Sequence, residues 1–575
     1  MLAVLIIILL FVAVAVFAAV VVLRVARAYL RFAGATMRGD SPASTPPFFS
    51  LLFFEIQSTF SFSKPMTVVF SSTQKIAVAV AGLLFHLLFW GQMQGVNLLL
   101  WYVACAAWLL SYGAAGAEAR RAPAAWAVAV GGLAAAGGVV LVGSGAAKLA
   151  TWTSLALLVG LVNQPALRQP VNALLTGAAN VLWGAVALPS LPRRARLGAD
   201  GSKQRSGTAR LWYYGRLLGL PLVAVFVFHL LFAIANPRYV ELVERVIDGL
   251  TAWLALLFVD LSITRVLFLV FGLALSAGVL LRTPLTRWLR QEGGATDAVQ
   301  RIRQARPGTG VLALRKEYLA ALAALVLLNG LLLVENALDI RYIWLDFRPA
   351  PDFDLSQFVH EGTWALVVSI LLAMAMVLYF FRANLNFYSS ALRRLRPLAT
   401  VWVLQNVVLA VSVGVRNYHY ISRMGLAYKR IGVCFFLLLT LFGLATVLLK
   451  VWRRRSAFRL VQLNSWAAYA VLLALALGNW EIWIARYNLR PRFRATLDRE
   501  FLLTMPPRVL PELVAYAEAF AGQDVVVDEQ LVTLNRRTRD FLSNYPQRGW
   551  LSWNWADERA YRALRQGALL RPAHH

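Results

Sequence analysis

The segment S-Q-F-V-H-E-G-T-W (356–364) opens the part of the chain that decides the fold. It leads into an apolar span that ends at Y-F-F-R-A-N-L-N-F (379–387). A second span follows and ends at R-N-Y-H-Y-I-S-R-M-G-L-A-Y-K-R-I-G-V (416–433). Apolar runs near 20 residues long are typical of helices that cross a bilayer. The segment therefore predicts two adjacent transmembrane helices that are flanked and interrupted by polar residues.

The composition extends this prediction to the whole chain. Apolar residues make up 59% of the 575 residues and charged residues 15%, whereas soluble domains carry about 25% charged residues. The mean hydropathy is +0.62, and 19 tryptophans suit a protein with two membrane–water interfaces. We therefore predict an all-α, polytopic transmembrane helix bundle with a small helical extramembrane C-terminal tail, and the lipid bilayer as its first partner.

The net charge of +29 does not indicate a nucleic-acid partner. The arginines cluster beside apolar spans, as the charges that orient membrane proteins do. The two cysteines, Cys105 and Cys434, both lie inside predicted spans and are far apart in sequence. They indicate neither a disulfide framework nor a zinc site.

Charge asymmetry between the loops predicts the sidedness. Basic loops mark the inner face of a membrane, and the acidic loop here is therefore assigned to the outer face. The basic loops are 191–211, 282–317, 382–396 and 450–459, and the acidic loop is 339–361. This pattern divides the chain into an N-terminal anchor with an inner loop (1–75), a transmembrane bundle (76–485) and an extracytoplasmic helical tail (486–575). The N-terminus and the tail are both predicted outside.

On this sidedness, the candidate spans before residue 191 cannot all cross the membrane. Five candidate spans separate two loops that both read as inner, 24–75 and 191–211, and an odd number of crossings cannot do so. One of the five is therefore expected to be re-entrant or interfacial, which gives twelve spans, or thirteen if the N-terminus has the opposite sidedness. The last span is predicted near 466–483. In the tail, one helix is predicted from a cap at Thr504 to Gly522 and another at 528–542.

The connection 416–430 breaks the charge pattern. It carries Arg416, Arg423, Lys429 and Arg430 and no acid, although short outer loops are usually poor in basic residues. The acidic loop 339–361 precedes it on the same face. We therefore predict ion pairs between these two segments, with Glu361 and Arg416 at neighbouring helix ends.

Two interpretations of this constellation stay open. The charges either stabilise the outer rim of the bundle, or line an outward-facing pocket for an anionic lipid or sugar phosphate, because arginine matches phosphate geometry. The candidate ligand-binding residues are His360, Glu361, Arg416, Asn417, Tyr420, Arg423, Tyr428, Lys429, Arg430 and Glu481. A polar path through the bundle is the second hypothesis, and hydrogen bonding between helices is its alternative. The path residues are Asn384, Asn386, Gln405 and Asn406.

Motifs for known chemistry are missing from the sequence. No G-x-x-x-x-G-K-[ST] loop for a nucleotide and no G-x-S-x-G nucleophile turn occurs. H-E-G-T-W (360–364) lacks the second histidine of a zinc-binding H-E-x-x-H. We therefore predict no catalytic residue, metal or cofactor, and an enzyme is not the favoured class.

Several motifs of the central stretch carry a family resemblance. They are V-H-E-G-T-W (359–364), N-L-N (384–386), W-V-L-Q-N (402–406), G-L-A-Y-K-R-I-G-V (425–433) and I-A-R-Y-N (484–488). Together they resemble bacterial membrane proteins of domain-of-unknown-function family 4173 and its relative, family 4153. The resemblance is densest over about 355–490 and extends upstream to about residue 76. It implies a multi-span inner-membrane protein and no activity.

Three functions remain as hypotheses. The leading one is a transport-like or ligand-sensing membrane protein with an outward-facing polar and basic cavity. The second is a membrane-embedded transferase that acts on a lipid-linked substrate at the outer leaflet. The third is a non-catalytic envelope scaffold whose tail recruits partners. A carboxylate facing a cavity would favour the first two, and an apolar bundle with the tail as the recruiting surface would favour the third.

Overall fold

The computed structural model describes residues 71–188, 263–282, 292–301, 310–346, 355–381, 384–517 and 525–570, with some positions between 225 and 246. Their regular secondary structure is helical apart from one isolated antiparallel bridge between Ala298 and Arg455. Eight of the described helices are long and apolar enough to cross a bilayer. The protein is thus an all-α, multi-pass membrane protein. The first span, the basic loop 191–211 and most of the span near 217–234 lie outside the described residues.

The first group of helices packs closely through small residues. A Cβ on Gly160 would lie 1.8 Å from the carbonyl oxygen of Ala173, and one on Gly177 would lie 1.8 Å from that of Ala156. Such contacts let helix backbones approach in lipid, where dispersion rather than the hydrophobic effect holds helices together. The helices are α3 (Ser72–Phe89), α4 (Val96–Ser111), α5 (Gly113–Ala119), α6 (Pro123–Leu141), α7 (Gly145–Asn163), α8 (Pro170–Ala187) and α11 (Ile263–Leu280).

None of the five candidate spans of this group is interrupted. α3, α4, α6, α7 and α8 are continuous helices of 18, 16, 19, 19 and 18 residues. A re-entrant segment would turn back partway, and none of these helices does so; that one of them is interfacial stays a prediction. The total of twelve spans stays a prediction.

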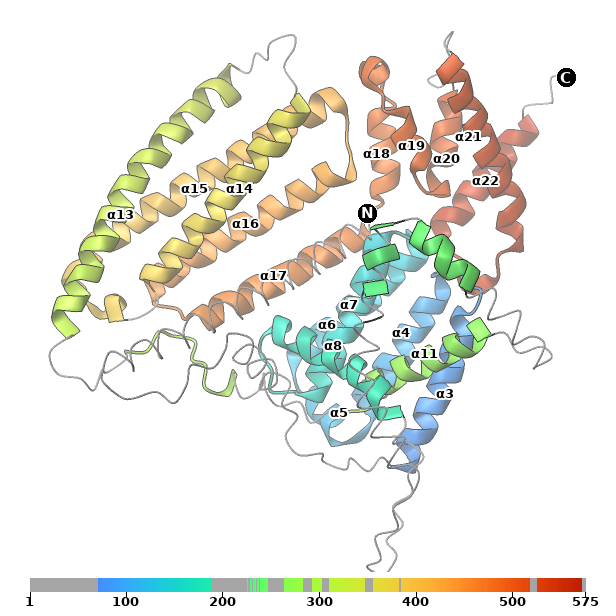
Figure 1. Ribbon diagram of the computed structural model, residues 1–575, viewed down its shortest axis with the longest axis horizontal. Helices are drawn as coiled ribbons and strands as arrows, with labels where there is room; N and C mark the ends of the chain where they lie inside the picture. Colours follow the sequence, from blue (N-terminus) through green and yellow to red (C-terminus); the bar gives the residue numbers. More distant parts are fainter. Residues whose placement is uncertain are drawn as a thin grey trace, which may run out of the picture. The chain divides into compact units, whose positions relative to one another are not determined.

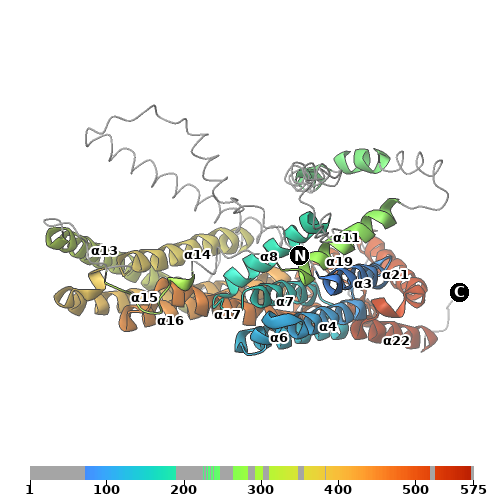
Figure 2. The same cartoon turned by 90° about the horizontal axis from the view of Figure 1, so that it is seen from below.

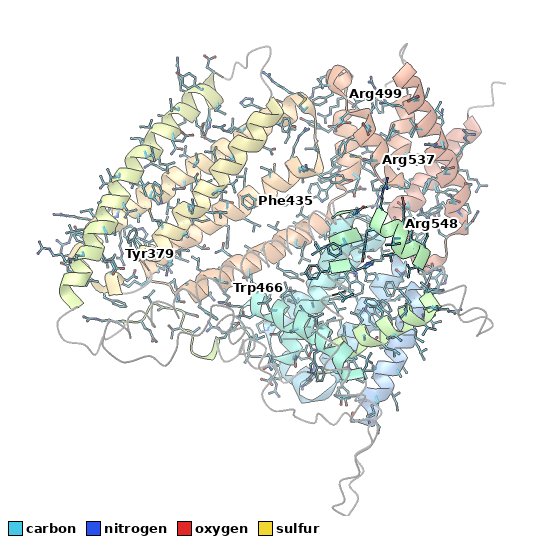
Figure 3. The ribbon with its side chains drawn as sticks, viewed as in Figure 1. Tyr379, Phe435, Trp466, Arg499, Arg537 and Arg548 are labelled. Atoms are coloured by element: carbon cyan, nitrogen blue, oxygen red, sulfur yellow. The ribbon has the colours of Figure 1, made fainter. Side chains whose placement is uncertain are left out.

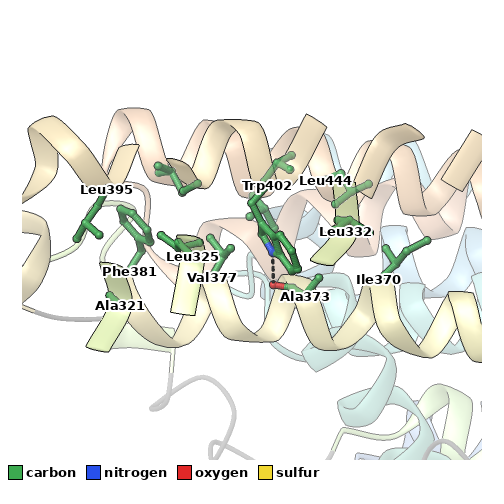
Figure 4. Close-up of a cluster of buried hydrophobic side chains, with 14 of the residues drawn as sticks. Ala321, Leu325, Leu332, Ile370, Ala373, Val377, Phe381, Leu395, Trp402 and Leu444 are labelled. Atoms are coloured by element: carbon green, nitrogen blue, oxygen red, sulfur yellow. Dashed lines mark hydrogen bonds between the residues drawn. The ribbon is translucent and has the colours of Figure 1, made fainter. Parts of the chain in front are cut away.

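The second group surrounds an apolar core (Figure 4). Its helices lie side by side in both ribbon views (Figures 1 and 2). Phe381, Leu325 and Trp402 meet in this core, and the Trp402 Nε1 donates a hydrogen bond of 3.4 Å to the carbonyl of Ala373. The helices are α13 (Gly310–Asp339), α14 (Leu355–Phe380), α15 (Ser389–Met424) and α16 (Tyr428–Arg453), with the short turns η2 (Ile340–Leu345) and η3 (Asn384–Phe387).

Helix α15 runs through most of the connection that was predicted to be a loop. Its 36 residues extend about 54 Å at 1.5 Å per residue, well beyond the roughly 30 Å hydrocarbon core. The residues from Arg416 to Met424 are therefore helical, and the turn into α16 consists of Gly425, Leu426 and Ala427.

Helix α17 (Ala457–Leu477) contacts both groups, since it packs against α16 and also against α6, α7 and α8. The span predicted to end at residue 483 ends here at Leu477. The Trp480 indole covers Gly478, where a Cβ would lie 2.2 Å from the ring, and its Nε1 donates to the Leu475 carbonyl at 2.8 Å. Helix α18 (Trp480–Asn488) therefore starts as a separate element.

The C-terminal domain is built from short helices around a core shared with the bundle. Ile431 of α16 and Ile484 of α18 are buried in the same cluster as Leu510 and Leu534. Its elements are η4 (Pro491–Thr496), α19 (Arg499–Thr504), η5 (Pro507–Val509), α20 (Leu510–Ala515), α21 (Val525–Asn544), η7 (Tyr545–Gln547), η8 (Trp550–Ser552) and α22 (Trp555–Leu570).

One of the two helix predictions for the tail is correct. α21 confirms the helix predicted at 528–542. The helix predicted from Thr504 to Gly522 is only partly right: η5 and α20 make residues 507–515 helical, but Thr504 ends α19, whose cap is Asp498. The prolines at 506 and 507 then interrupt the helix before α20.

Glu292 binds the start of α8 at the end of the bundle that lies opposite the C-terminal domain. Its carboxylate accepts hydrogen bonds from the backbone nitrogens of Arg168 (2.6 Å) and Gln169 (3.3 Å) and from Asn172 Nδ2 (2.7 Å). These groups belong to the start of α8, where backbone N–H groups have no partner within the helix and a negative charge is favourable. The neighbouring segment then pairs with the α16–α17 turn through the bridge between Ala298 and Arg455.

Replacing Glu292 with alanine is expected to lower the free energy of unfolding by about 2–3 kcal/mol, because three donors lose a charged acceptor. Thermal unfolding of the purified protein in detergent measures the loss. Gly294→Ala is the control, since a Cβ there meets nothing within 4 Å. Equal midpoints for the two variants would contradict this role of Glu292.

Candidate functional site

A buried ion pair joins the end of α13 to α15. Arg416 Nη2 lies 2.5 Å from Asp339 Oδ1, and 7% of Arg416 and 3% of Asp339 are exposed. Asp339 is the last residue of α13 and is followed by the π-helical turn η2. π-Helical turns are rare in proteins. Those that occur are frequently found at functional sites. The second oxygen of Asp339, Oδ2, has no hydrogen-bond partner among the described residues.

This pair confirms the predicted ion pairing between the segments 339–361 and 416–430. The acid is Asp339, at the start of the acidic segment. The side chains of Glu361 and His360 lie outside the described residues, so their predicted contacts stay predictions.

Arg430 holds the turn between α15 and α16. Its guanidinium lies over the ring of Tyr420, 4.0 Å from the ring centre, and its Nη1 donates to the carbonyl of Met424 at 2.8 Å. Asn417 Nδ2 donates in turn to the backbone carbonyl of Arg430 at 3.1 Å. These contacts are made within the protein and rigidify the turn.

The motifs G-L-A-Y (425–428) and Y-N (487–488) meet at this turn. Gly425 has a φ of 77°, a conformation that glycine adopts without strain, and a Cβ there would lie 2.5 Å from Asn488 Oδ1. The Asn488 amide accepts from the nitrogen of Leu426 (2.6 Å) and donates to its carbonyl (2.8 Å). The two motifs are therefore coupled by structure, because Gly425 leaves the space that the Asn488 side chain occupies in this turn.

The amides of the predicted polar path hydrogen-bond neighbouring helices or their own backbone. Gln405 Nε2 donates to Asn329 Oδ1 at 2.7 Å, and Asn336 Nδ2 donates to the Gln405 carbonyl at 3.1 Å. Asn406 and Asn386 donate within their own segments, to the carbonyls of Trp402 (2.8 Å) and Phe381 (2.9 Å). The side chain of Asn384 lies outside the described residues. These contacts are typical of interhelical bonding in membranes.

Five polar side chains gather where the C-terminal domain meets the bundle. We call this set the junction cluster. Lys148 lies within electrostatic range of Arg508, Asp557 and Glu481, and Tyr428 lies within range of Glu481 and Arg508. The five come from α7, η5, α22, α18 and α16, so the cluster forms only when these elements pack together.

Arg508 is the centre of the junction cluster. It donates to the carbonyls of Val142 and Gly143, at the end of α6, with Nη2 3.0 Å from the Gly143 oxygen. Its Nε faces Asp557 Oδ1 at 3.8 Å, and neither atom has a hydrogen-bond partner among the described residues. Asp557 Oδ2 also accepts from Arg548 Nη1 at 3.1 Å. Arg548 is labelled in Figure 3.

Glu481 is a buried carboxylate of the junction cluster, and one of its oxygens is unsatisfied among the described residues. It is 5% exposed and lies in the first turn of α18. Its Oε2 has no hydrogen-bond partner within the described part of the chain. A buried carboxylate without a donor is costly, so the nearby positive charges and the helix N-terminus are what stabilise it.

Residues 104–516 match the profile of a domain of unknown function, DUF4153. The chain belongs to this family. Family 4153 was the relative named beside family 4173 on the sequence motifs. No curated protein and no solved structure matches the chain. The DUF4153 match contains Lys148, Glu481 and Arg508, whereas Asp557 and helices α21 and α22 follow it.

The structure distributes the predicted ligand-binding residues of this DUF4153 protein over three places. The first set forms the rim contacts of α15 and the turn: Arg416, Asn417, Tyr420 and Arg430. The second set belongs to the junction cluster: Tyr428 and Glu481. The third set is exposed at the surface: Arg423 and Lys429.

Sequence reasoning missed Lys148, Arg508 and Asp557. Lys148 carried a usable signal, since it is a lysine inside an Ala/Gly-rich apolar stretch and ionisable residues within spans usually have a role. Arg508 and Asp557 carried none, because many charges surround them in the tail sequence. Within the described residues no three His, Cys, Asp or Glu side chains are placed to hold a metal ion.

Proposed function

We propose that this chain is a ligand-binding membrane protein of a transport-like or sensing kind. Its site is the junction cluster, on the extracytoplasmic side. The observation that carries the proposal is the buried Glu481, whose Oε2 has no hydrogen-bond partner among the described residues. Lys148 lies within electrostatic range of this carboxylate and of Arg508, and Tyr428 lies within range of both Glu481 and Arg508.

The charge balance of the site favours an anionic ligand. Lys148 and Arg508 of the junction cluster, together with Arg548, which lies outside the cluster and pairs with Asp557, contribute three positive charges, and Glu481 and Asp557 contribute two negative charges. The remaining positive charge attracts an anion, and the free oxygen of Glu481 accepts a hydroxyl. A ligand that carries both groups is a sugar or polyol phosphate, because ammonium and guanidinium groups bind phosphate oxygens.

Thermal unfolding of the purified protein with added glycerol 3-phosphate tests this function. A saturable rise in the unfolding midpoint is expected, equivalent to about 2.7 kcal/mol when the ligand is at 100 times its Kd. Glu481→Gln and Lys148→Met should remove the rise. Arg539→Gln, an exposed change in the C-terminal domain, should keep it. An equal rise in all variants would indicate a salt effect and would overturn the proposal, as would no rise with glycerol 3-phosphate or glucose 6-phosphate.

A second function, the non-catalytic envelope scaffold, is favoured by one observation. The C-terminal domain shares a continuous core with α16 and α18, so it is held at a fixed position on the bundle. A scaffold requires this rigidity and no ligand. The glycerol 3-phosphate titration separates the two functions, because a scaffold predicts no concentration-dependent change in the midpoint.

A further inference from the structure

A pair of arginines follows α18 and shares one aromatic ring. The guanidinium centres of Arg490 and Arg492 each lie 5.0 Å from the centre of the Tyr487 ring, and Arg492 also lies 4.6 Å from the Phe493 ring. Both arginines are exposed. We call Tyr487, Arg490 and Arg492 the tyrosine patch.

The tyrosine patch is rigid before any ligand arrives. Phe493 is 2% exposed and its ring lies 5.3 Å from that of Tyr487. The buried Phe493 side chain therefore anchors the turn η4. Thr496 Oγ1 donates to the carbonyl of Arg423 at 3.1 Å and attaches the end of η4 to the end of α15. Stacking on an aromatic ring restricts a guanidinium while its N–H groups stay available to an acceptor.

No carboxylate of the described chain pairs with Arg490 or Arg492. Exposed Lys429 lies at the neighbouring turn between α15 and α16 and adds to the positive surface. Arginines that only served solubility would gain nothing from sharing one ring, since their like charges repel. Both guanidiniums are therefore available to an anion from outside the chain.

The patch lies near the level of the lipid headgroups. Trp483 on α18 and Tyr418 on α15 are 54% and 66% exposed, and exposed Trp and Tyr of this kind mark the membrane–water interface. Arg490 follows Trp483 by seven residues, at most about 10 Å along a helix, which an arginine side chain partly spans. Phospholipid phosphates are the anions at this level.

We infer that the tyrosine patch binds the phosphate headgroup of an anionic phospholipid in the outer leaflet. The two guanidiniums donate to the phosphodiester oxygens, and Tyr487 holds them at the required spacing. This site accounts for basic residues on the translocated side, where short loops are usually poor in them. It is independent of the junction cluster and of the ligand proposed there.

Lipid retention tests the inference. The full-length protein is reconstituted in vesicles of equal phosphatidylglycerol and phosphatidylcholine, extracted in mild detergent, and its bound lipid is quantified by mass spectrometry. We expect the wild type to retain phosphatidylglycerol over phosphatidylcholine by about tenfold, which corresponds to 1.4 kcal/mol. The double variant Arg490→Gln/Arg492→Gln should lose most of this preference, and Tyr487→Leu should lose part of it while Tyr487→Phe keeps it.

The control carries the same loss of charge elsewhere in the C-terminal domain. Arg539→Gln/Arg565→Gln removes two exposed arginines and should retain the preference. Millimolar glycerol 3-phosphate is then added to the wild type, and displacement of the lipid would show that the phosphate group alone is recognised. Equal retention by the two double variants would overturn the inference. Glu481→Gln should retain lipid normally, so failure of this site is distinguishable from failure of the proposed function.

Discussion

Replacing Arg416 with alanine is expected to destabilise the bundle by about 3–5 kcal/mol. The change removes one partner of a buried ion pair and leaves Asp339 as an uncompensated carboxylate. Asp339 is 3% exposed, and its Oδ2 already has no hydrogen-bond partner among the described residues, so water cannot replace the lost charge at low cost. Asp339→Ala should cost a similar amount for the same reason. Thermal unfolding in detergent, or extraction yield at fixed temperature, measures both.

A double replacement separates the pair from its neighbours. Asp339→Leu/Arg416→Met removes both charges together, and apolar replacements of a buried pair are often neutral or stabilising. The double variant should therefore be more stable than either single variant, with a coupling of more than 1 kcal/mol. Arg394→Ala, an exposed change on the same helix, should stay within about 0.5 kcal/mol of the wild type. Additive losses in the double variant would show that the two side chains do not act as a pair.

Replacing Arg508 with alanine is expected to release the C-terminal domain from the bundle. Arg508 is 9% exposed, donates to two carbonyls at the end of α6, and faces Asp557. Its loss leaves those carbonyls without their donor and leaves Asp557 with Arg548 as its remaining cation. Each unsatisfied buried group costs about 1–3 kcal/mol, so the local loss is on the order of 3–5 kcal/mol.

Limited proteolysis measures this release directly. Trypsin should cut the Arg508→Ala variant in the C-terminal domain at least tenfold faster than the wild type, while fragments of the bundle stay intact. Arg508→Lys should recover part of the protection, because a lysine keeps the charge but not the forked geometry. Arg562→Ala is the control, since Arg562 pairs with Glu558 at the surface. Unchanged cleavage of Arg508→Ala would exclude Arg508 as the connection between the domain and the bundle.

The sequence predicted the membrane fold and one contact of the site for clear physical reasons. Lipid requires long apolar helices, so their approximate positions follow from hydropathy alone. The excess of positive charge on the connection 416–430 predicted an acidic partner, and in the structure this partner is Asp339. The identity of the acid that pairs with Arg416 was less predictable. It depends on how far α13 continues before the turn η2.

Features that depend on tertiary contacts were beyond sequence reasoning. The end of α17 at Leu477 is set by the Trp480 ring folding back over Gly478, and an apolar pattern does not record this contact. The junction cluster was missed because its members lie between Lys148 and Asp557, more than 400 residues apart in sequence. Nothing in the order of residues along the chain indicates that these positions meet.

Cysteine labelling in intact cells tests the central claim, that the C-terminal domain covers the extracytoplasmic end of the bundle. Ser543→Cys on α21 and Gly293→Cys beside Glu292 are introduced separately into a variant without Cys105 and Cys434. Both positions are exposed, and contacts place them at opposite ends of α6 and α7. If the C-terminal domain is extracytoplasmic, we expect a membrane-impermeant maleimide to label the cysteine at 543 in intact cells. The cysteine at 293 should be labelled only after permeabilisation. The reverse pattern would contradict the central claim and would move the junction cluster and the tyrosine patch to the cytoplasmic face.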